Sequence, residues 1–219
     1  LRRCFSLLVQ HDLLDSNPAS RIPMYPESGT ERYLQSEDLR KLLVALSNGT
    51  KRNFMFRMIA LYLLSTGARL NEALKATWKD IDRENRVWRI PASISKSKKV
   101  RSVPLNDSAI EVLDQLGTEG KYEWLFVNAA RGERLKYVHR VWERLRDKAG
   151  MPNLRLHDLR HTHASMLINQ GHTLFIVQNI LGHKDPSVTQ RYAHLSTKSL
   201  QDASDSASKM IQGAMEKTA

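Results

Sequence analysis

The sequence has few of the features that mark secreted, membrane-spanning or cysteine-ligated metal proteins. Its single cysteine, Cys4, excludes a disulfide framework and a cysteine-based zinc finger. A reducing compartment is therefore expected, which we take to be the cytoplasm. The longest apolar run has about seven residues, 58–64, whereas a membrane span needs roughly 20. No signal-peptide pattern stands at the N-terminus. We therefore expect no membrane partner.

Acidic residues are also scarce. The 219 residues include 34 Lys and Arg against 23 Asp and Glu, a formal net charge of +11. Residues 195–219 hold equal numbers of basic and acidic side chains, so the whole excess lies in residues 1–194. A basic body with a neutral tail favours a polyanionic partner such as DNA or RNA.

The apolar pattern predicts a mainly α fold with a small antiparallel β-sheet at one edge, an α+β class. Helical spacing is expected over 1–14, from Ser36, over 53–65, and again after an interruption at 66–68. Period-two patterning predicts strands at 87–90 and 100–104, joined by a basic turn. Further helices are expected at about 107–116, 136–149, 158–170, 174–181 and 187–193. The hydrophobic content of 41% is sufficient for a packed core.

Three short motifs carry groups suited to phosphate chemistry. In Thr-Gly-Ala-Arg-Leu-Asn-Glu-Ala, Arg69 and Glu72 share one face of a new helix, at an end that favours an anion. In Leu-His-Asp-Leu-Arg-His-Thr, His157 and Arg160 point the same way, and His161 lies near that face. Arg binds two phosphate oxygens at once, and His donates a hydrogen bond or moves a proton. A surface ion pair and a basic helix face are the alternatives for these two motifs.

The third motif is Leu-Gly-His, with Tyr192 nine residues after His183. Taken alone, Gly-His indicates a helix C-cap and a tyrosine indicates a core position. Taken together and in this order, the three motifs and the basic hairpin resemble the catalytic domain of the tyrosine recombinase (phage integrase) family. The resemblance runs from about residue 33 to 195. Residues 1–20 resemble the last helix of the core-binding domain that precedes the catalytic domain in that family.

The resemblance implies a domain organisation. Residues 1–20 would be the remnant of a core-binding domain, 21–32 a linker, 33–195 the catalytic domain and 196–219 a helical tail for protomer contacts. Because the chain starts with Leu1 inside a helical pattern, we expect it to be a fragment. In the tail, apolar residues recur at intervals of three and four over 197–216, which predicts an amphipathic helix docked on a neighbouring protomer. The alternative is a helix fixed in cis.

The resemblance also implies an activity: site-specific cleavage and rejoining of DNA through a 3′-phosphotyrosyl intermediate. No metal, ATP or other cofactor is implied. The expected partners are double-stranded DNA, three further copies of the chain in a tetramer on DNA, and accessory DNA-bending proteins. The free chain is expected to be a monomer or a weak oligomer.

Roles follow for individual residues by the same resemblance. Arg69 and Arg160 would clamp the scissile phosphate, His183 would donate a third bond, and Glu72 would support the pocket. His157 would accept a proton or bind phosphate, and Tyr192 would be the nucleophile. Lys96 in the hairpin would protonate the leaving oxygen. The remaining expected DNA contacts are Lys98, Lys99 and Arg101.

Three other functions fit the sequence less well. The two histidines of His157-Asp-Leu-Arg-His161 have the i,i+4 spacing of zinc hydrolases, but Asp158 replaces the expected Glu and Arg160 would set a cation beside the metal. A helix-turn-helix DNA-binding protein without catalysis has no need of Tyr192 at its spacing from His183. A type IB topoisomerase-like enzyme shares the chemistry, but the length and motif spacing favour the recombinase.

Overall fold

A computed structural model describes residues 1–23, 32–95 and 98–216, and the side chains of 197–199 and 213–216 are not described within the last range. The chain divides into two units, Leu1–Thr30 and Glu31–Ala219. Within the described residues no helix is both long and apolar enough to cross a membrane. The expected linker residues 24–31 and the hairpin residue Lys96 fall outside the description.

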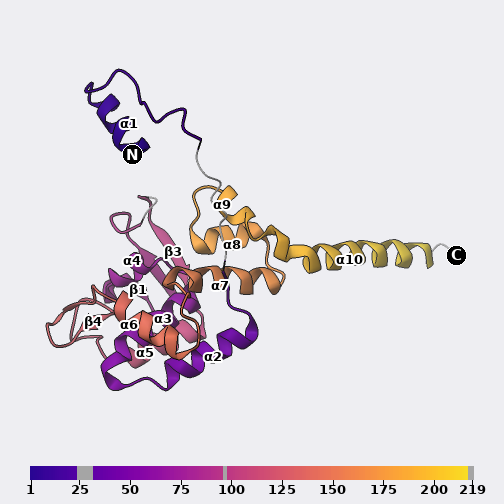
Figure 1. The fold of residues 1–219 in the computed structure, drawn as a ribbon. Helices are drawn as coiled ribbons and strands as arrows, with labels where there is room; N and C mark the ends of the chain where they lie inside the picture. Colours follow the sequence, from indigo (N-terminus) through magenta and orange to yellow (C-terminus); the bar gives the residue numbers. More distant parts are fainter. Residues whose placement is uncertain (24–31, 96–97, 217–219) are drawn as a thin grey trace. The chain divides into compact units, whose positions relative to one another are not determined.

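The first unit consists of one helix, α1 (Arg2–Gln10), and the turns and bends that follow it up to residue 23 (Figure 1). The Arg2 guanidinium donates hydrogen bonds to the carbonyl oxygens of Ala19, Ser20 and Ile22, at 3.0, 2.5 and 2.7 Å. Asn17 adds a bond from its side-chain amide to the Arg2 carbonyl. These bonds close the segment back on the helix. The helix ends at Gln10, four residues before the end expected from apolar spacing.

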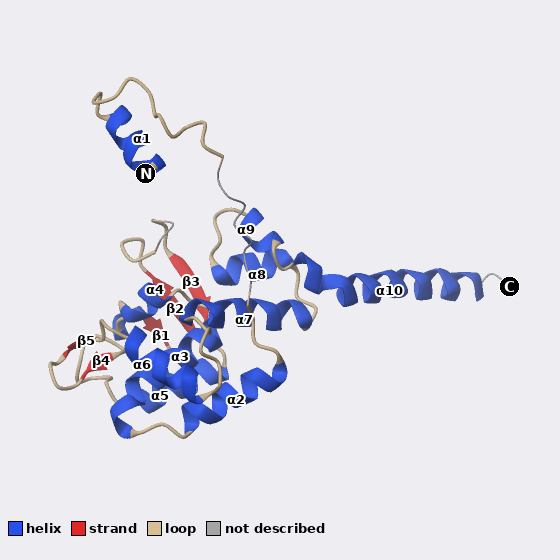
Figure 2. Cartoon of the chain, viewed as in Figure 1, coloured by secondary structure: helices blue, strands red, loops and turns tan. Residues whose placement is uncertain are grey.

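The second unit is helical apart from two small antiparallel sheets, as Figure 2 shows. Its elements in chain order are α2 (Ser36–Ser47), η1 (Lys51–Asn53), α3 (Phe54–Thr66), α4 (Leu70–Leu74), η2 (Trp78–Asp80), β1 (Ile81–Asp82), β2 (Val87–Ile90), β3 (Arg101–Pro104), α5 (Asp107–Leu116), β4 (Val127–Asn128), β5 (Glu133–Arg134), α6 (His139–Lys148), α7 (Leu156–Asn169), α8 (Leu174–Leu181), α9 (Ser187–Gln190), η3 (Ala193–Ser196) and α10 (Thr197–Glu216). The predicted class, mainly α with a small antiparallel sheet, is confirmed.

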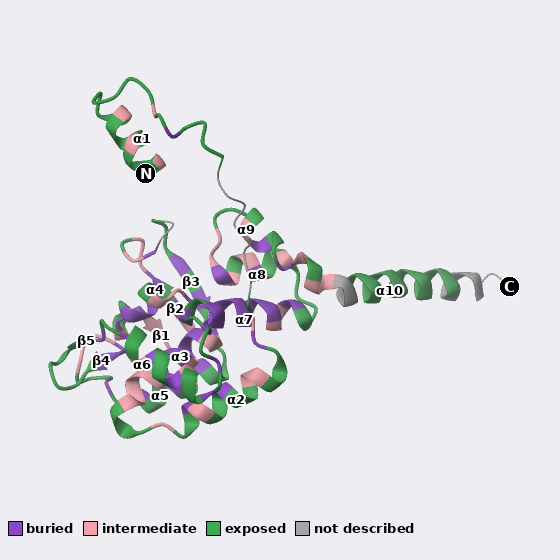
Figure 3. Ribbon diagram, in the orientation of Figure 1, coloured by how far each residue is buried: buried purple, intermediate pink, exposed green. Residues whose placement is uncertain are grey.

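The core is organised around α3, whose sequence is apolar on nearly every side and which packs against both α5 and α7. Figure 3 shows α3 and α7 as largely buried helices. On its other side α7 packs against α8. A second, smaller cluster lies there, formed by Ala164, Ile168, Val177, Leu181 and Tyr192. Helix α7 therefore lies between the main core and this cluster.

The larger sheet has the strand order β1-β2-β3, with Trp88 opposite Val103 and Ile90 opposite Arg101. The expected strands at 87–90 and 100–104 are present as β2 and β3. Strand β1 and the β4–β5 hairpin were not expected, because two-residue strands carry too little alternation to detect. The helix expected over 187–193 ends at Gln190 and is followed by a turn and the 3₁₀ helix η3.

Candidate active site

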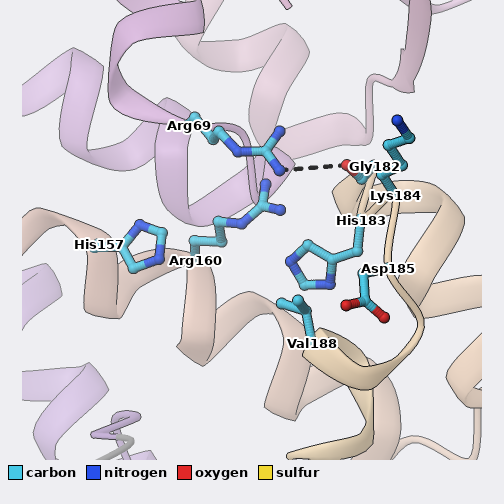
Figure 4. A pocket seen from close by; sticks show the side chains of 8 residues that line it. All are labelled: Arg69, His157, Arg160, Gly182, His183, Lys184, Asp185 and Val188. Carbon is cyan, nitrogen blue, oxygen red and sulfur yellow. Dashed lines mark hydrogen bonds between the residues drawn. The ribbon is translucent and has the colours of Figure 1, made fainter. Parts of the chain in front are cut away.

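A cavity of about 340 Å³ lies where the ends of several elements meet (Figure 4). Arg69 stands just before α4, His157 and Arg160 lie in the first turns of α7, and His183 follows α8. The full lining is Arg69, His157, Arg160, Gly182, His183, Lys184, Asp185 and Val188. Four residues that the sequence motifs single out, from three separate stretches of chain, are thus brought to one cavity.

Arg69 is held by the helix start that follows it. Its backbone N–H donates to Glu72 Oε2 at 3.1 Å, and its Nη1 donates to Glu72 Oε1 at 3.0 Å. Glu72 is only 2% exposed. Burial opposes ionisation of Glu72, but the charges of Arg101 and Arg69 and the Arg69 N–H outweigh it, so the pKa of this carboxyl is lowered. The carboxylate therefore stays charged and fixes the Arg69 side chain.

Arg160 is almost fully enclosed, at 3% exposure. Its two terminal nitrogens donate to the carbonyl oxygens of Gly67 and Leu181, both at 2.7 Å. Burial, followed by the charges of Arg69 and Arg101, lowers the pKa of Arg160 to about 9. The side chain remains protonated at neutral pH, in surroundings where an added anion is strongly favoured.

Gly67 makes room for this arrangement. It ends α3 with φ of 62°, a left-handed conformation that glycine adopts without strain. A Cβ there would lie 2.6 Å from His163 Cδ2 and 2.8 Å from Leu181 Cδ2. The His163 ring in turn bonds through Nδ1 to the Leu64 carbonyl at 2.9 Å. His163 therefore belongs to the packing behind the cavity.

The two cavity histidines differ in their surroundings. His183 Nδ1 is hydrogen-bonded to Thr189 Oγ1 at 2.8 Å. Burial, with the charges of Arg160 and Arg69, lowers the pKa of His183 to about 3. Partial desolvation by the surrounding protein, together with the Arg160 charge, lowers the pKa of His157 as well. Figure 4 shows the two imidazoles on either side of Arg160. Neutral His183 therefore offers a hydrogen bond rather than a third full charge.

Tyr192 does not line the cavity. Its side chain is 2% exposed and packs in the smaller hydrophobic cluster, with Leu181 among its neighbours. Its phenolic oxygen is hydrogen-bonded to His161 Nδ1 at 2.6 Å. Burial is the largest cause that lowers the pKa of His161, to about 4. The sequence motifs give His161 no role of its own. Its place four residues after His157, on the same helix face, is the feature of the sequence that points to the site.

The basic hairpin is placed only in part. Lys98 and Lys99 are exposed, and Lys98 has φ of 53°. Lys99 and Arg101, with Gly182 and His183, are among the residues that line a neighbouring cavity of about 300 Å³. Arg101, expected to contact DNA, is buried, and its guanidinium donates hydrogen bonds to Glu72 and to the Ile180 carbonyl.

No group of three or more His, Cys, Asp or Glu side chains in the described ranges is arranged to hold a metal ion. His157 and His161 do approach each other, with ring centroids 4.8 Å apart in an edge-to-face arrangement. The zinc-site alternative therefore lacks a third ligand of these types in that part of the chain.

Comparison with known proteins gives consistent results. The model of the Phage integrase family matches residues 32–199. The chain is 28% identical to the integrase of Salmonella phage P22 over 86% of this chain and 50% of that protein. It is 30% identical to tyrosine recombinase XerC of Staphylococcus haemolyticus over 91% of this chain and 69% of that protein. The chain thus spans half the length of the phage P22 relative.

Solved structures with similar folds include two integrases and a recombinase. The Tn1549 transposon integrase in complex with transposon right end DNA has a TM-score of 0.74 at 21% identity, covering 94% of this chain and 76% of that one. XerH site-specific recombinase bound to difH substrate has a TM-score of 0.67 at 26% identity, covering 92% of this chain and 62% of that one. The catalytic domain of bacteriophage HP1 integrase has a TM-score of 0.60 at 28% identity, covering 79% of this chain and 93% of that one.

Proposed function

The chain belongs to the Phage integrase family, and on that premise we propose that it cleaves and rejoins double-stranded DNA at specific sites through a covalent bond to Tyr192. The relatives named above are integrases and tyrosine recombinases, and some of their structures contain DNA. The net charge of +11 suits the same partner.

The observation that carries the proposal is the excess of positive charge around the cavity. Besides burial, the charge of Arg69 contributes to lowering the pKa of both Arg101 and Arg160, and Glu72 is the carboxylate that pairs with Arg69 and Arg101. Partly buried guanidinium groups with one carboxylate between them favour the arrival of an anion. A phosphodiester has two non-bridging oxygens, which Arg69 and Arg160 can bind from adjacent positions.

In the proposed reaction the Tyr192 oxygen attacks the phosphorus of the scissile phosphodiester. A bond forms between that oxygen and phosphorus, and the bond from phosphorus to the 5′ oxygen breaks. The products are a 3′-phosphotyrosyl link and a free 5′ hydroxyl, so the bond energy is retained for rejoining without ATP. The phenolic proton goes to His157, and Lys96 protonates the leaving oxygen.

The cationic groups act on the transition state. Attack by the phenol places extra negative charge on the phosphate oxygens, where Arg69, Arg160 and the His183 imidazole can stabilise it. A free phenol has a pKa near 10 and is a weak nucleophile at neutral pH. Cations beside it favour the phenoxide. The site needs no reorganisation of Arg69, because Glu72 already fixes it.

Tyr192 has to leave its buried position before it can react. In the structure it sits in the smaller cluster and outside the cavity lining. It stands in the turn between the four-residue helix α9 and the 3₁₀ helix η3. Short elements of this kind reorganise at a lower free-energy cost than the long helices of the core. The proposed reaction therefore includes a local movement of the α9–η3 segment.

We assign the tail a role between protomers. All the side chains described from Leu200 to Gln212 of α10 are exposed, including the large apolar residues Leu200, Met210 and Ile211. An apolar stripe on a helix without net positive charge is poorly suited to DNA and well suited to protein. In the proposed assembly of four protomers on two duplexes, α10 docks on the neighbouring protomer. We also propose, from the family resemblance, that accessory DNA-bending proteins are partners of this assembly.

The decisive experiment is capture of a covalent adduct. The chain is incubated with nicked duplexes drawn from the DNA that flanks its gene, and adducts are detected on a denaturing gel. We expect an adduct with the unsubstituted chain and none with Tyr192→Phe, while DNA binding stays nearly unchanged. Tyr137→Phe is the control, because Tyr137 is 84% exposed and does not line the cavity.

The outcomes separate the functions. An adduct from Tyr192→Phe would remove Tyr192 as the nucleophile. Binding without any adduct would favour a DNA-binding protein without catalysis. Relaxation of supercoiled DNA without exchange of strands between duplexes would favour a topoisomerase-like activity.

A further inference from the structure

The C-terminal end of α8 is bound by three arginines from three different elements. Helix ends leave their last carbonyl groups without partners in the helix and carry partial negative charge. Here the consecutive carbonyls of residues 180, 181 and 182 accept hydrogen bonds from Arg101, Arg160 and Arg69, at 2.7, 2.7 and 3.3 Å. This helix end leads directly into His183.

Arg101 differs from the other two arginines in its place relative to the catalytic cavity. It lies on β3, its side chain is 8% exposed, and it lines the neighbouring cavity rather than the catalytic one. Its Nη2 donates to Glu72 Oε2 at 2.5 Å, and its Nη1 donates to the Ile180 carbonyl. Both terminal nitrogens therefore bond to groups of the protein itself.

The backbone beside Arg101 is fitted to its stem. A Cβ at Gly182 would lie 2.2 Å from Arg101 Cδ and 2.7 Å from its Nε. Gly182 has φ of 66°, which also favours glycine. The arginine stem thus lies directly against the residue that precedes His183.

These contacts close a ring of hydrogen bonds. Arg101 binds Glu72, Glu72 binds Arg69, Arg69 binds the Gly182 carbonyl, and Arg101 returns to the same helix end at Ile180. The ring joins β3, the start of α4 and the end of α8, which lie far apart in the sequence. A planar guanidinium can make both of the Arg101 bonds at fixed directions, which a lysine cannot.

We infer that Arg101 is a positioning residue of the active site, which aligns Arg69 and His183 through Glu72 and the end of α8, and that it does not bind DNA. This inference rests on the proposed function for its kinetic readout. It replaces the expectation from the sequence that Arg101 is a DNA contact alongside Lys98 and Lys99.

The test compares Arg101→Lys and Arg101→Met with Arg89→Met. Arg89 is the matched control, since it lies opposite Ser102 on the paired strand and its exposed guanidinium bonds to Asp82. Adduct formation is measured at saturating nicked DNA, well below the unfolding midpoint of each variant, and DNA affinity is measured over a range of salt concentrations. If Arg101→Met does not fold, Arg101→Lys, which keeps a charge beside Glu72, carries the test.

We expect Arg101→Lys to lower the rate at saturation by about a hundredfold, the effect of a small misplacement of catalytic groups. Its affinity and salt dependence should match those of Arg89→Met. A phosphate contact would behave in the opposite way, with weaker binding, a log–log salt slope reduced by about 0.9, and an unchanged rate at saturation. That pattern, or a normal rate and normal binding, would overturn the inference.

Two further measurements separate neighbouring explanations. A 5′-bridging phosphorothiolate substrate, whose thiolate leaves without a proton, should not restore the rate of Arg101→Lys. Restoration would mean that Arg101 acts by placing the hairpin acid, and the inference would fail. The NMR signal of the His183 ring needs no DNA: it should shift in Arg101→Lys and not in Arg89→Met. An unmoved His183 signal would refute the positioning role, whereas absence of any adduct from the unsubstituted chain would refute the proposed function instead.

Discussion

Tyr192 should be protected from chemical modification in the free chain. Burying a side chain of this size contributes about 1.5 to 3 kcal/mol, and its hydrogen bond to His161 adds about 0.5 to 1.5 kcal/mol. Together these terms favour the buried position by about 2 to 4.5 kcal/mol. At about 1.4 kcal/mol per factor of ten, buried Tyr192 outnumbers exposed Tyr192 by about 30-fold to about 1,600-fold.

Nitration with tetranitromethane measures this ratio. Trypsin releases Tyr192 and Tyr137 in different peptides, because each follows a basic residue, so mass spectrometry can follow the two rates separately. Tyr137 is 84% exposed and serves as the internal reference. We expect Tyr192 to react more slowly than Tyr137 by about the factor calculated above, at least about 30-fold.

A substitution tests the hydrogen bond separately. His161→Ala removes the partner of the phenol and should raise the nitration rate of Tyr192 by about 2- to 12-fold. His172→Ala is the control, because His172 is exposed and lies in the turn before α8. Equal rates for Tyr192 and Tyr137 in the unsubstituted chain would refute the reasoning. An unchanged rate in His161→Ala would leave burial as the only source of protection.

Four further outcomes are expected. Lys96→Ala should cleave normal DNA very slowly and regain its rate on a 5′-bridging phosphorothiolate; rescue of a neighbouring lysine variant instead would move the role of acid to that lysine. The pKa values of His161 and His183, about 4 and about 3, lie below the ordinary 6.5. Between pH 6.5 and these values, the two histidines therefore bind more protons in the unfolded chain than in the folded one. The melting temperature should therefore hold above pH 6.5 and fall as the pH drops toward 4, and a flat profile would contradict this. DNA affinity of the chain should decrease steeply with salt, and salt-insensitive binding in a filter assay would count against phosphate contacts. Deleting residues 197–219 should leave adduct formation on one nicked site while impairing multi-protomer complexes in sedimentation; an unfolded monomer would instead place the tail in cis.

Much of the fold was predictable because its signals are local. Asn106 accepts the backbone N–H of Ala109, and Gly117 ends the helix in a left-handed conformation, so α5 has the bounds expected from the sequence. Helix α8 is bounded in the same way by Thr173 and Gly182. Helix α7 begins two residues before the expected start, because the Asp158 carboxylate accepts the Arg155 N–H at 2.7 Å. A cap by a long basic residue gives little signal in a sequence.

The residues of the site were predictable from the sequence only in part. The motifs taken together, through their resemblance to the tyrosine recombinase family, pick out Arg69, His157, Arg160 and His183, which share one cavity. Spacing could not indicate that Arg101 is buried, since that depends on how β3 meets α8. Nor could it place the Tyr192 side chain, because the choice between cavity and core is made by packing.

Leu181 connects two parts of the molecule that the motifs treat separately. Its side chain packs in the cluster that holds Tyr192, and its carbonyl oxygen accepts the Arg160 guanidinium. In the reaction we propose, a phosphate that binds Arg160 would weaken this hydrogen bond, and Leu181 would pass the change to the cluster that holds Tyr192. Binding of the substrate and release of the proposed nucleophile would then be coupled through a single residue.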